Sequence, residues 1–187
     1  MKLRMKVLVG LATLLVFSSS WAAATPAECQ EALGKMKGLG NVAAMLGESY
    51  GYAIMPTIGK GGIGIGGAGG SGCVYAGGVH TGNTSMGQIT IGFQLGGQAF
   101  TQIILFKNKD TYDSFITGEF EFGAQATAVA LTYGASAEAG TKGASSSAGD
   151  TKGAGAWKRG MAVFTLAKGG LMYEATIGGQ KYKYKPL

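Results

Sequence analysis

The stretch GKGGIGIGGAGGSG, residues 59–72, decides how the rest of the chain is interpreted. Glycine fills 35 of the 187 positions and is densest here. Ile63 and Ile65 alternate with glycines, and a period of two is that of a β-strand. Glycine inside a strand marks a bulge, a tight bend or the close approach of another backbone. The stretch therefore predicts strands of a strongly curved sheet packed around a small core, rather than a disordered linker.

A phosphate-binding loop is the other structure that these glycines suggest. Residues 64–69 fit G-x-G-x-x-G, but that motif requires a helix opening at its last glycine and an acid about 20 residues further on. No helix can start within this run, and residues 84–90 contain no acid. Gly61 also stands where a Walker A motif needs Ser or Thr for its metal. We therefore expect no bound nucleotide, and no cofactor of another kind.

The remaining sequence predicts a mainly antiparallel α+β domain. Capping residues and apolar spacing predict N-terminal helices over residues 25–37 and 41–48 and one short internal helix over 108–117. Strands are expected over 51–58, 73–79, 86–106, 119–133, 161–167, 171–177 and 180–185. Pro56 marks an edge or a turn in the first of these, and Gly96-Gly97 makes 86–106 either two strands or one bent strand.

Glycines also mark three further predicted turns. Turns are expected at Gly82-Asn83, at residues 168–170 and at residues 178–179. Residues 135–160 consist mostly of Gly, Ala, Ser and Thr and predict a flexible insertion. The sheet is expected to be strongly curved or barrel-like, with Ile, Phe, Ala and Gly on its inside.

The first 24 residues predict a secretory signal peptide. Lys2, Arg4 and Lys6 give a positive start, residues 7–17 are apolar but too few to span a membrane, and residues 22–24 are small alanines suited to cleavage. An uncleaved anchor is the open alternative. Cleavage removes three of the 16 bases and none of the 10 acids, which leaves one domain over residues 25–187 with a net charge of +3. We expect this mature protein to be periplasmic or associated with the outer membrane.

Cys29 and Cys73 are the two cysteines of the chain. In an oxidising compartment an even pair predicts one disulfide, and two buried free thiols are the alternative. A bridge would close a loop of about 45 residues and stabilise the fold by roughly 4 kcal/mol on the chain-entropy model. Two cysteines and one histidine, His80, are too few and too scattered to predict a metal site.

Residues that carry catalysis are scarce in this sequence. His80 is the single histidine and lies beside a predicted turn, and no G-x-S-x-G nucleophile elbow is present. Glu119 and Glu121 share a strand face, an arrangement that belongs more often to a solvated surface than to acid–base chemistry. We expect no enzymatic activity. The small net charge and the predicted export also argue against nucleic acid as a partner.

The basic residues suggest a binding surface. Lys181, Lys183 and Lys185 alternate with tyrosines and form a row on one face of the last predicted strand. Lys60, Lys168 and the pair Lys158-Arg159 fall in predicted turns or at loop ends. If these positions adjoin, they form a basic patch for phosphate head groups. The alternative is that the lysines protect an exposed strand edge against sheet-to-sheet aggregation.

Four separated motifs resemble the SYLF domain. They are YGYA with GKGG (residues 50–53 and 59–62), QLGGQ (94–98), FEFGAQA (120–126) and AVFTLAKGGLMYEA (162–175). The resemblance runs from about Glu31 to Tyr184 and is closest to the bacterial, exported, single-domain branch. It implies a lipid-binding module. Members in eukaryotes bind phosphoinositides and associate with actin, but an exported bacterial protein meets neither, so we expect neither as a partner here.

Together these observations predict non-catalytic binding of anionic phospholipid head groups at a membrane surface of the bacterial envelope. The expected partners are anionic membrane lipids. The alternative is a structural or protein-interaction module of the periplasm or outer membrane, whose partner would be an envelope protein.

Overall fold

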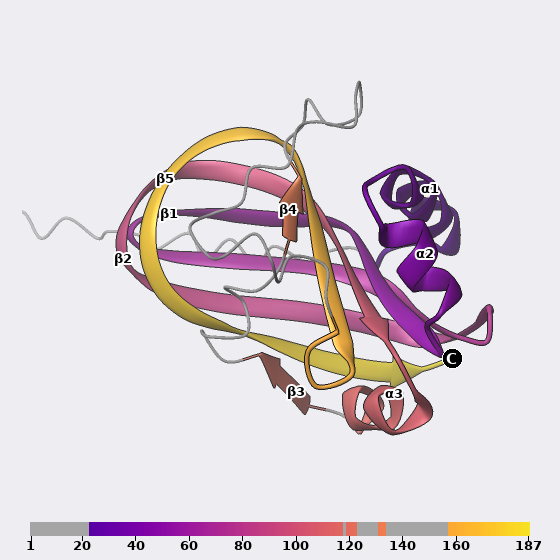
Figure 1. The fold of residues 1–187 in the computed structure, drawn as a ribbon. Coiled ribbons are helices and arrows are strands. Elements are labelled where there is room, and N and C mark those ends of the chain that lie inside the picture. The colour runs from indigo at the N-terminus through magenta and orange to yellow at the C-terminus, as the bar shows by residue number, and fades with distance from the viewer. Residues whose placement is uncertain (1–22, 118, 123–130, 134–156) are drawn as a thin grey trace, which may run out of the picture.

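The computed structural model describes residues 23–117, 119–122, 131–133 and 157–187. The elements occur in the order α1 (Pro26–Lys37), α2 (Val42–Gly47), β1 (Gly51–Ala76), β2 (Val79–Phe106), α3 (Lys109–Ile116), β3 (Glu119–Phe122), β4 (Leu131–Tyr133) and β5 (Met161–Pro186) (Figure 1). The strands form one sheet in the order β1-β2-β5-β3, with β4 also paired to β5. All pairs are antiparallel except β4 with β5. The predicted α+β class with a mainly antiparallel sheet is confirmed.

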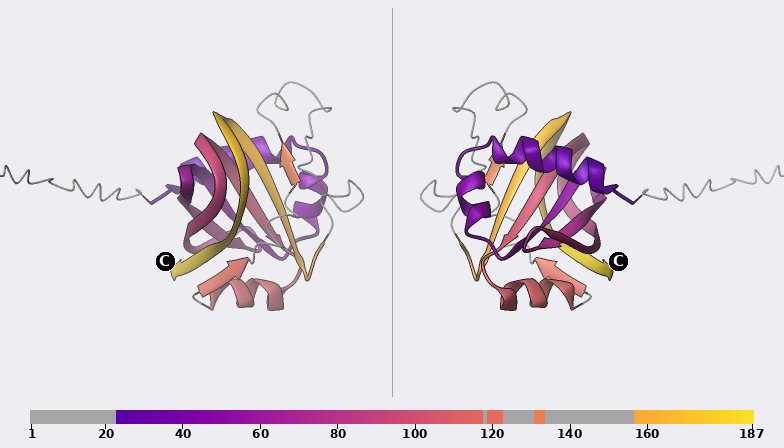
Figure 2. Two further views of the ribbon diagram at one scale, coloured as in Figure 1. Left: turned by 90° about the vertical axis from the view of Figure 1, so that its left-hand side faces the viewer. Right: turned by 90° about the vertical axis from the view of Figure 1, so that its right-hand side faces the viewer.

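The three long strands bend together and fold the sheet over on itself (Figures 1 and 2). The bend lies where glycines of neighbouring strands stand opposite one another: Gly61 and Gly62 pair with Gly97 and Gly96, and Gln98 beside them pairs with Gly170 of β5. Beyond the bend, the second half of β1 returns so close to the first half that a Cβ atom on Gly72 would lie 2.1 Å from the carbonyl oxygen of Ile54. The glycines are therefore required by a backbone approach that leaves no space for a side chain.

The strongly curved sheet is thus confirmed, whereas the barrel-like alternative is wrong. Among the described strands, β1 and β3 end the sheet order and each has a partner on one side only. The curvature comes from glycines within each long strand, which fold that strand back, and not from strands staggered around a closed ring.

Several glycine-containing segments predicted as turns lie inside strands. Gly82-Asn83 belongs to β2, and residues 168–170 and 178–179 belong to β5, which runs unbroken over 26 residues. Residues 86–106 are part of one bent strand, and residues 51–58 and 73–79 are not separate strands, because β1 continues through the glycine run. The chain turns between β1 and β2 at Gly77-Gly78, where both glycines have positive φ, as a tight hairpin requires.

Two clusters of buried side chains flank the first half of the sheet. One lies between the two halves and under α3, with Met55, Ile104, Phe106, Phe115 and Tyr182 among its members. The other lies beneath α1 and α2, where Cys29, Leu33 and Met36 of α1 pack on the sheet. The apolar face of α1 is therefore buried in its own domain. Cys29 and Cys73 form the predicted disulfide, which ties α1 to β1.

The helices begin where the sequence predicts. Thr25 and Glu28 form a reciprocal capping box at the start of α1, with Pro26 in its first turn. Residues 1–22 and 134–156, which hold most of the predicted signal peptide and most of the predicted insertion, lie outside the described residues, as do residues 123–130 of the strand predicted over 119–133. Within the described part of the chain, no helix has both the length and the apolar character needed to cross a membrane.

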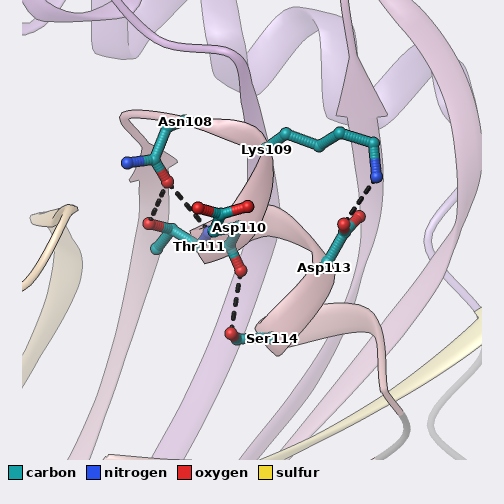
Figure 3. A network of polar contacts seen from close by, with 6 residues as sticks. All are labelled: Asn108, Lys109, Asp110, Thr111, Asp113 and Ser114. Atoms are coloured by element: carbon teal, nitrogen blue, oxygen red, sulfur yellow. Dashed lines mark hydrogen bonds and ion pairs between the residues drawn. The ribbon is translucent and has the colours of Figure 1, made fainter.

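Asn108 caps the N-terminus of α3 and contributes to its stability. Its side-chain oxygen accepts hydrogen bonds from the backbone N–H of Thr111 at 3.0 Å and from the Thr111 hydroxyl at 2.7 Å (Figure 3). Asn108→Ala leaves that N–H without its cap, so we expect the free energy of unfolding to fall by about 1 kcal/mol. Denaturant unfolding measures this change. Asn108→Asp, which keeps an acceptor oxygen, should retain most of the stability, and equal losses in both variants would contradict the capping role.

Candidate functional site

The row of lysines on β5 lies on an exposed face of the sheet. Lys181, Lys183 and Lys185 are exposed, whereas Tyr182 is buried and Tyr184 is half-buried on the opposite face. The predicted alternation of lysines and tyrosines is confirmed. Successive lysines on the same face are about 7 Å apart along the strand, because each residue of an antiparallel strand advances about 3.4 Å.

The tyrosines beneath this row fix the strand in the interior. The Tyr182 hydroxyl lies 2.7 Å from Oε1 of Gln102 and 2.8 Å from Oε1 of Gln180, within the fold. Burial raises the pKa of Tyr182 far above its ordinary value, so its phenol stays protonated. The Tyr184 hydroxyl donates to the carbonyl oxygen of Thr81 at 2.9 Å. These contacts hold the lysine face outward and set its register.

Strand β3 lies beside the lysine row and supplies the carboxylate of Glu121. Glu121 pairs in register with Lys181, and Glu119 with Lys183. Lys181 Nζ is 3.5 Å from Glu121 Oε2, and both side chains are more than half exposed. An exposed ion pair of this kind contributes at most about 1 kcal/mol. Because β2 and β3 flank β5 here, protection of a free strand edge does not explain Lys181 or Lys183.

The neighbouring strands extend this surface with small residues and isoleucines. Lys183 pairs with Ser85 and Lys181 with Gly87, which in turn pair with Ser71 and Gly69 of β1. Ile89 lies two residues beyond Gly87 on the same face and is 74% exposed. Ile65 of β1 lies two residues before Gly67, the β1 partner of Ile89, and is 68% exposed. We call this surface the open face; its members are Ile65, Ser85, Gly87, Ile89, Lys181, Lys183 and Lys185.

Exposure of the isoleucines corrects the prediction that they line the core. Ile63, two residues before Ile65, is 81% exposed. A Cβ atom on Gly62 would lie 2.4 Å from the Cα of Gly66, so the inside of the bend has no space for side chains. The glycines therefore face inward and the isoleucines outward. The period of two in the sequence was interpreted correctly as a strand, but the assignment of its two faces was wrong.

The described helices leave the open face uncovered. Helices α1 and α2 pack on the outer side of the first half of the sheet, with Ile54, Leu105 and Phe164, and α3 packs on Phe106 and Tyr182. At its border with β1, the open face meets the segment that precedes α1, where the backbone N–H of Ala24 donates to the Ser71 hydroxyl at 2.8 Å. The lysine row, the small residues and the isoleucines thus form one continuous exposed surface.

A family model matches residues 87–183, which include Ile89, Lys181 and Lys183 of the open face. The family is Ysc84, described as Las17-binding protein actin regulator. The chain belongs to this family. The match confirms the resemblance to SYLF domains, since this is the SYLF family. No curated protein and no solved structure matches the chain.

Lys158 and Arg159 lie within the residues that the Ysc84-family model matches, but the structure places them away from the open face. They lie in the turn before β5, where the backbone N–H of Lys158 donates to the Met161 carbonyl at 2.8 Å and Arg159 has a φ of 49°. The adjacent Lys107 was missed in the sequence; its Nζ is 5.7 Å from the centre of the Trp157 ring. Figure 2 shows α3 between this turn and the C-terminal end of β5. Lys158 and Arg159 therefore do not extend the lysine row directly.

Lys168 and Lys60 lie on opposite faces of the folded sheet of this Ysc84-family chain. Lys168 is the extra residue at a register shift in β5, and its Nζ donates to the Thr57 hydroxyl at 2.8 Å. Lys60 follows Ile58 by two residues and so points to the same inner face as that buried side chain; it is half-buried. The seven predicted head-group residues are thus not one patch: three form the row, two lie in the turn before β5, and two stand apart.

Proposed function

We propose that this chain binds anionic phospholipid head groups without catalysis, at a membrane surface of the bacterial envelope. The observation that carries the proposal is the row of three exposed lysines on a sheet face that no described helix covers. Basic side chains near an anionic lipid surface each contribute about 1 kcal/mol to association. Membership of the SYLF family supports a binding role for the domain. The N-terminal charge and apolar pattern supports export.

The geometry of the row suits a phosphate-bearing surface. Lys181 and Lys183 have small residues, Gly87 and Ser85, beside them on β2, so no larger neighbour on that side blocks a flat surface. The weak exposed pair between Lys181 and Glu121 can exchange its carboxylate for a phosphate. Tyr182 and Tyr184 anchor the strand from behind, so the lysines need little backbone ordering on binding.

Charge reversal of the row tests the proposal. We expect the triple variant Lys181→Glu, Lys183→Glu, Lys185→Glu to bind phosphatidylglycerol vesicles roughly 100-fold more weakly than the unchanged protein at low salt. The measurement is co-sedimentation with vesicles. The matched control reverses Lys35, Lys37 and Lys109, which lie on α1 and α3, and so changes the net charge equally. Equal losses in the two variants, or no vesicle binding by the unchanged protein, would contradict the proposed site.

A protein-interaction role is the second candidate, because the description of the family names binding to a protein. Applied to this chain, it predicts that an envelope protein contacts the open face. Cross-linking in intact cells, followed by comparison of the unchanged protein with the two charge variants, separates the candidates. A specific protein adduct lost only from the Lys181, Lys183, Lys185 variant, without vesicle binding, would favour this role over lipid binding.

A further inference from the structure

We infer that Ile63, Ile65 and Ile89 form an apolar insertion site, which enters the outer acyl region of the same bilayer whose head groups the lysine row contacts. The inference rests on the proposed function and adds a second, hydrophobic component to it. Isoleucine is among the residues most often fully buried, yet these three are 81%, 68% and 74% exposed. Within the described chain they gather on two neighbouring strands at one place, the bend of the sheet.

The register places the isoleucines and the lysines on one surface. Ile89 pairs with Gly179 of β5, and Lys181 lies two residues further along that strand on the same face. Such diagonal neighbours are about 7 Å apart. Between the two groups lie Ser85, Gly87, Gly67 and Gly69, which have small side chains or none. A flat surface can therefore touch the lysines and the isoleucines at the same time.

The charge pattern selects a bilayer as the occupant. From Gly61 to Phe106, the chain contains no Asp, Glu, Lys or Arg. The β1 and β2 segments that carry the isoleucines therefore bring no charged side chain of their own into the lipid, where desolvation of a charge would oppose insertion. A protein partner that recognises charge finds none at the isoleucines, whereas the adjacent lysine row favours an anionic surface. An apolar cluster beside cationic side chains is the arrangement of interfacial membrane contacts.

The backbone limits the depth of insertion. In the described sheet, β1 pairs with β2 alone, so its outer edge has backbone N–H and C=O groups that no other strand satisfies. Such groups are costly in the hydrocarbon core but are satisfied by water in the head-group region. The isoleucine side chains therefore enter the acyl boundary while the strand backbone stays in the interface.

The salt concentration separates the electrostatic component of vesicle binding from the hydrophobic component. We expect the triple variant Ile63→Ser, Ile65→Ser, Ile89→Ser to bind mixed phosphatidylglycerol and phosphatidylcholine vesicles roughly 100-fold more weakly at high salt, where apolar burial dominates. The charge-reversal variant should lose chiefly the low-salt binding. The control is Val79→Ser with Leu187→Ser, which changes exposed apolar residues away from the isoleucines. All variants alter exposed side chains, and thermal unfolding verifies that each remains folded.

The depth of insertion is measured from the fluorescence of a tryptophan placed at the insertion site. Ile65→Trp should lose fluorescence in vesicles with brominated acyl chains, and Val79→Trp should not; Trp157 contributes equally to both. Unchanged high-salt binding by the serine variant, with loss in the charge-reversal variant, overturns the insertion site and leaves the proposed function standing. Unchanged binding by the charge-reversal variant overturns the proposed function. If the serine variant loses self-association but keeps vesicle binding, the insertion site is overturned, and the isoleucines contact a second copy of the chain instead.

Discussion

Gly72→Ala is expected to lower the free energy of unfolding by at least about 3 kcal/mol, since overpacking that displaces backbone lies at the upper end of such effects. The added Cβ would lie 2.1 Å from the Ile54 carbonyl oxygen and 2.8 Å from Met55 Cγ. Both neighbours belong to the first half of the same strand, so relief of the clash requires the two halves of β1 to separate. Denaturant unfolding followed by circular dichroism measures the loss.

Gly87→Ala is the matched control for this prediction. Gly87 also lies within a long strand, but a Cβ there meets nothing within 4 Å. Alanine restricts the unfolded chain more than glycine does, so this variant should gain about 0.5 kcal/mol. If the free energy of unfolding falls for Gly72→Ala and rises for Gly87→Ala, then the close approach of the strand halves, rather than glycine content in general, sets the stability. Similar small changes at both would show that β1 does not fold back as tightly as described.

The glycines also explain which parts of the fold the sequence predicts. Alternation identifies the strand at Ile63 and Ile65, and caps together with apolar spacing locate all three helices within a residue or two. A glycine pair, however, has the same local character in a turn as in a bent strand. Gly96-Gly97 stands opposite Gly61-Gly62, which precedes it by more than thirty residues, so the bend follows from a pairing between distant segments. Local sequence contains no signal for that register.

The candidate site shows the same difference between features that local sequence predicts and features that depend on the folded backbone. The alternation of Lys181, Lys183 and Lys185 with tyrosines is local, and it predicts the exposed row correctly. The isoleucines were placed inside because apolar residues usually face a core, and the clash at Gly62 that turns them outward involves the folded backbone. One sequence signal points to this end of the molecule: the absence of charged residues over residues 61–106.

Removal of the disulfide is expected to have the largest effect on stability. Cys29 and Cys73 are separated by 44 residues, and a bridge over such a loop stabilises by roughly 4 kcal/mol through the restriction of the unfolded chain. The double variant Cys29→Ala, Cys73→Ala should therefore unfold at a markedly lower denaturant concentration. Its denaturant dependence should be steeper, because an unfolded chain without the bridge exposes more surface.

Reduction of the unchanged protein gives an independent measurement of the same quantity. Addition of a reducing agent should lower its stability toward that of the double variant and leave the double variant itself unaffected. Both cysteines are fully buried, Cys29 on α1 and Cys73 on β1, and they belong to the cluster that packs this helix on the sheet. Part of the loss in the alanine variant therefore comes from packing, and the difference between reduction and substitution separates that part from the loop entropy. Equal stability with and without the bridge would show that packing alone holds α1 on the sheet.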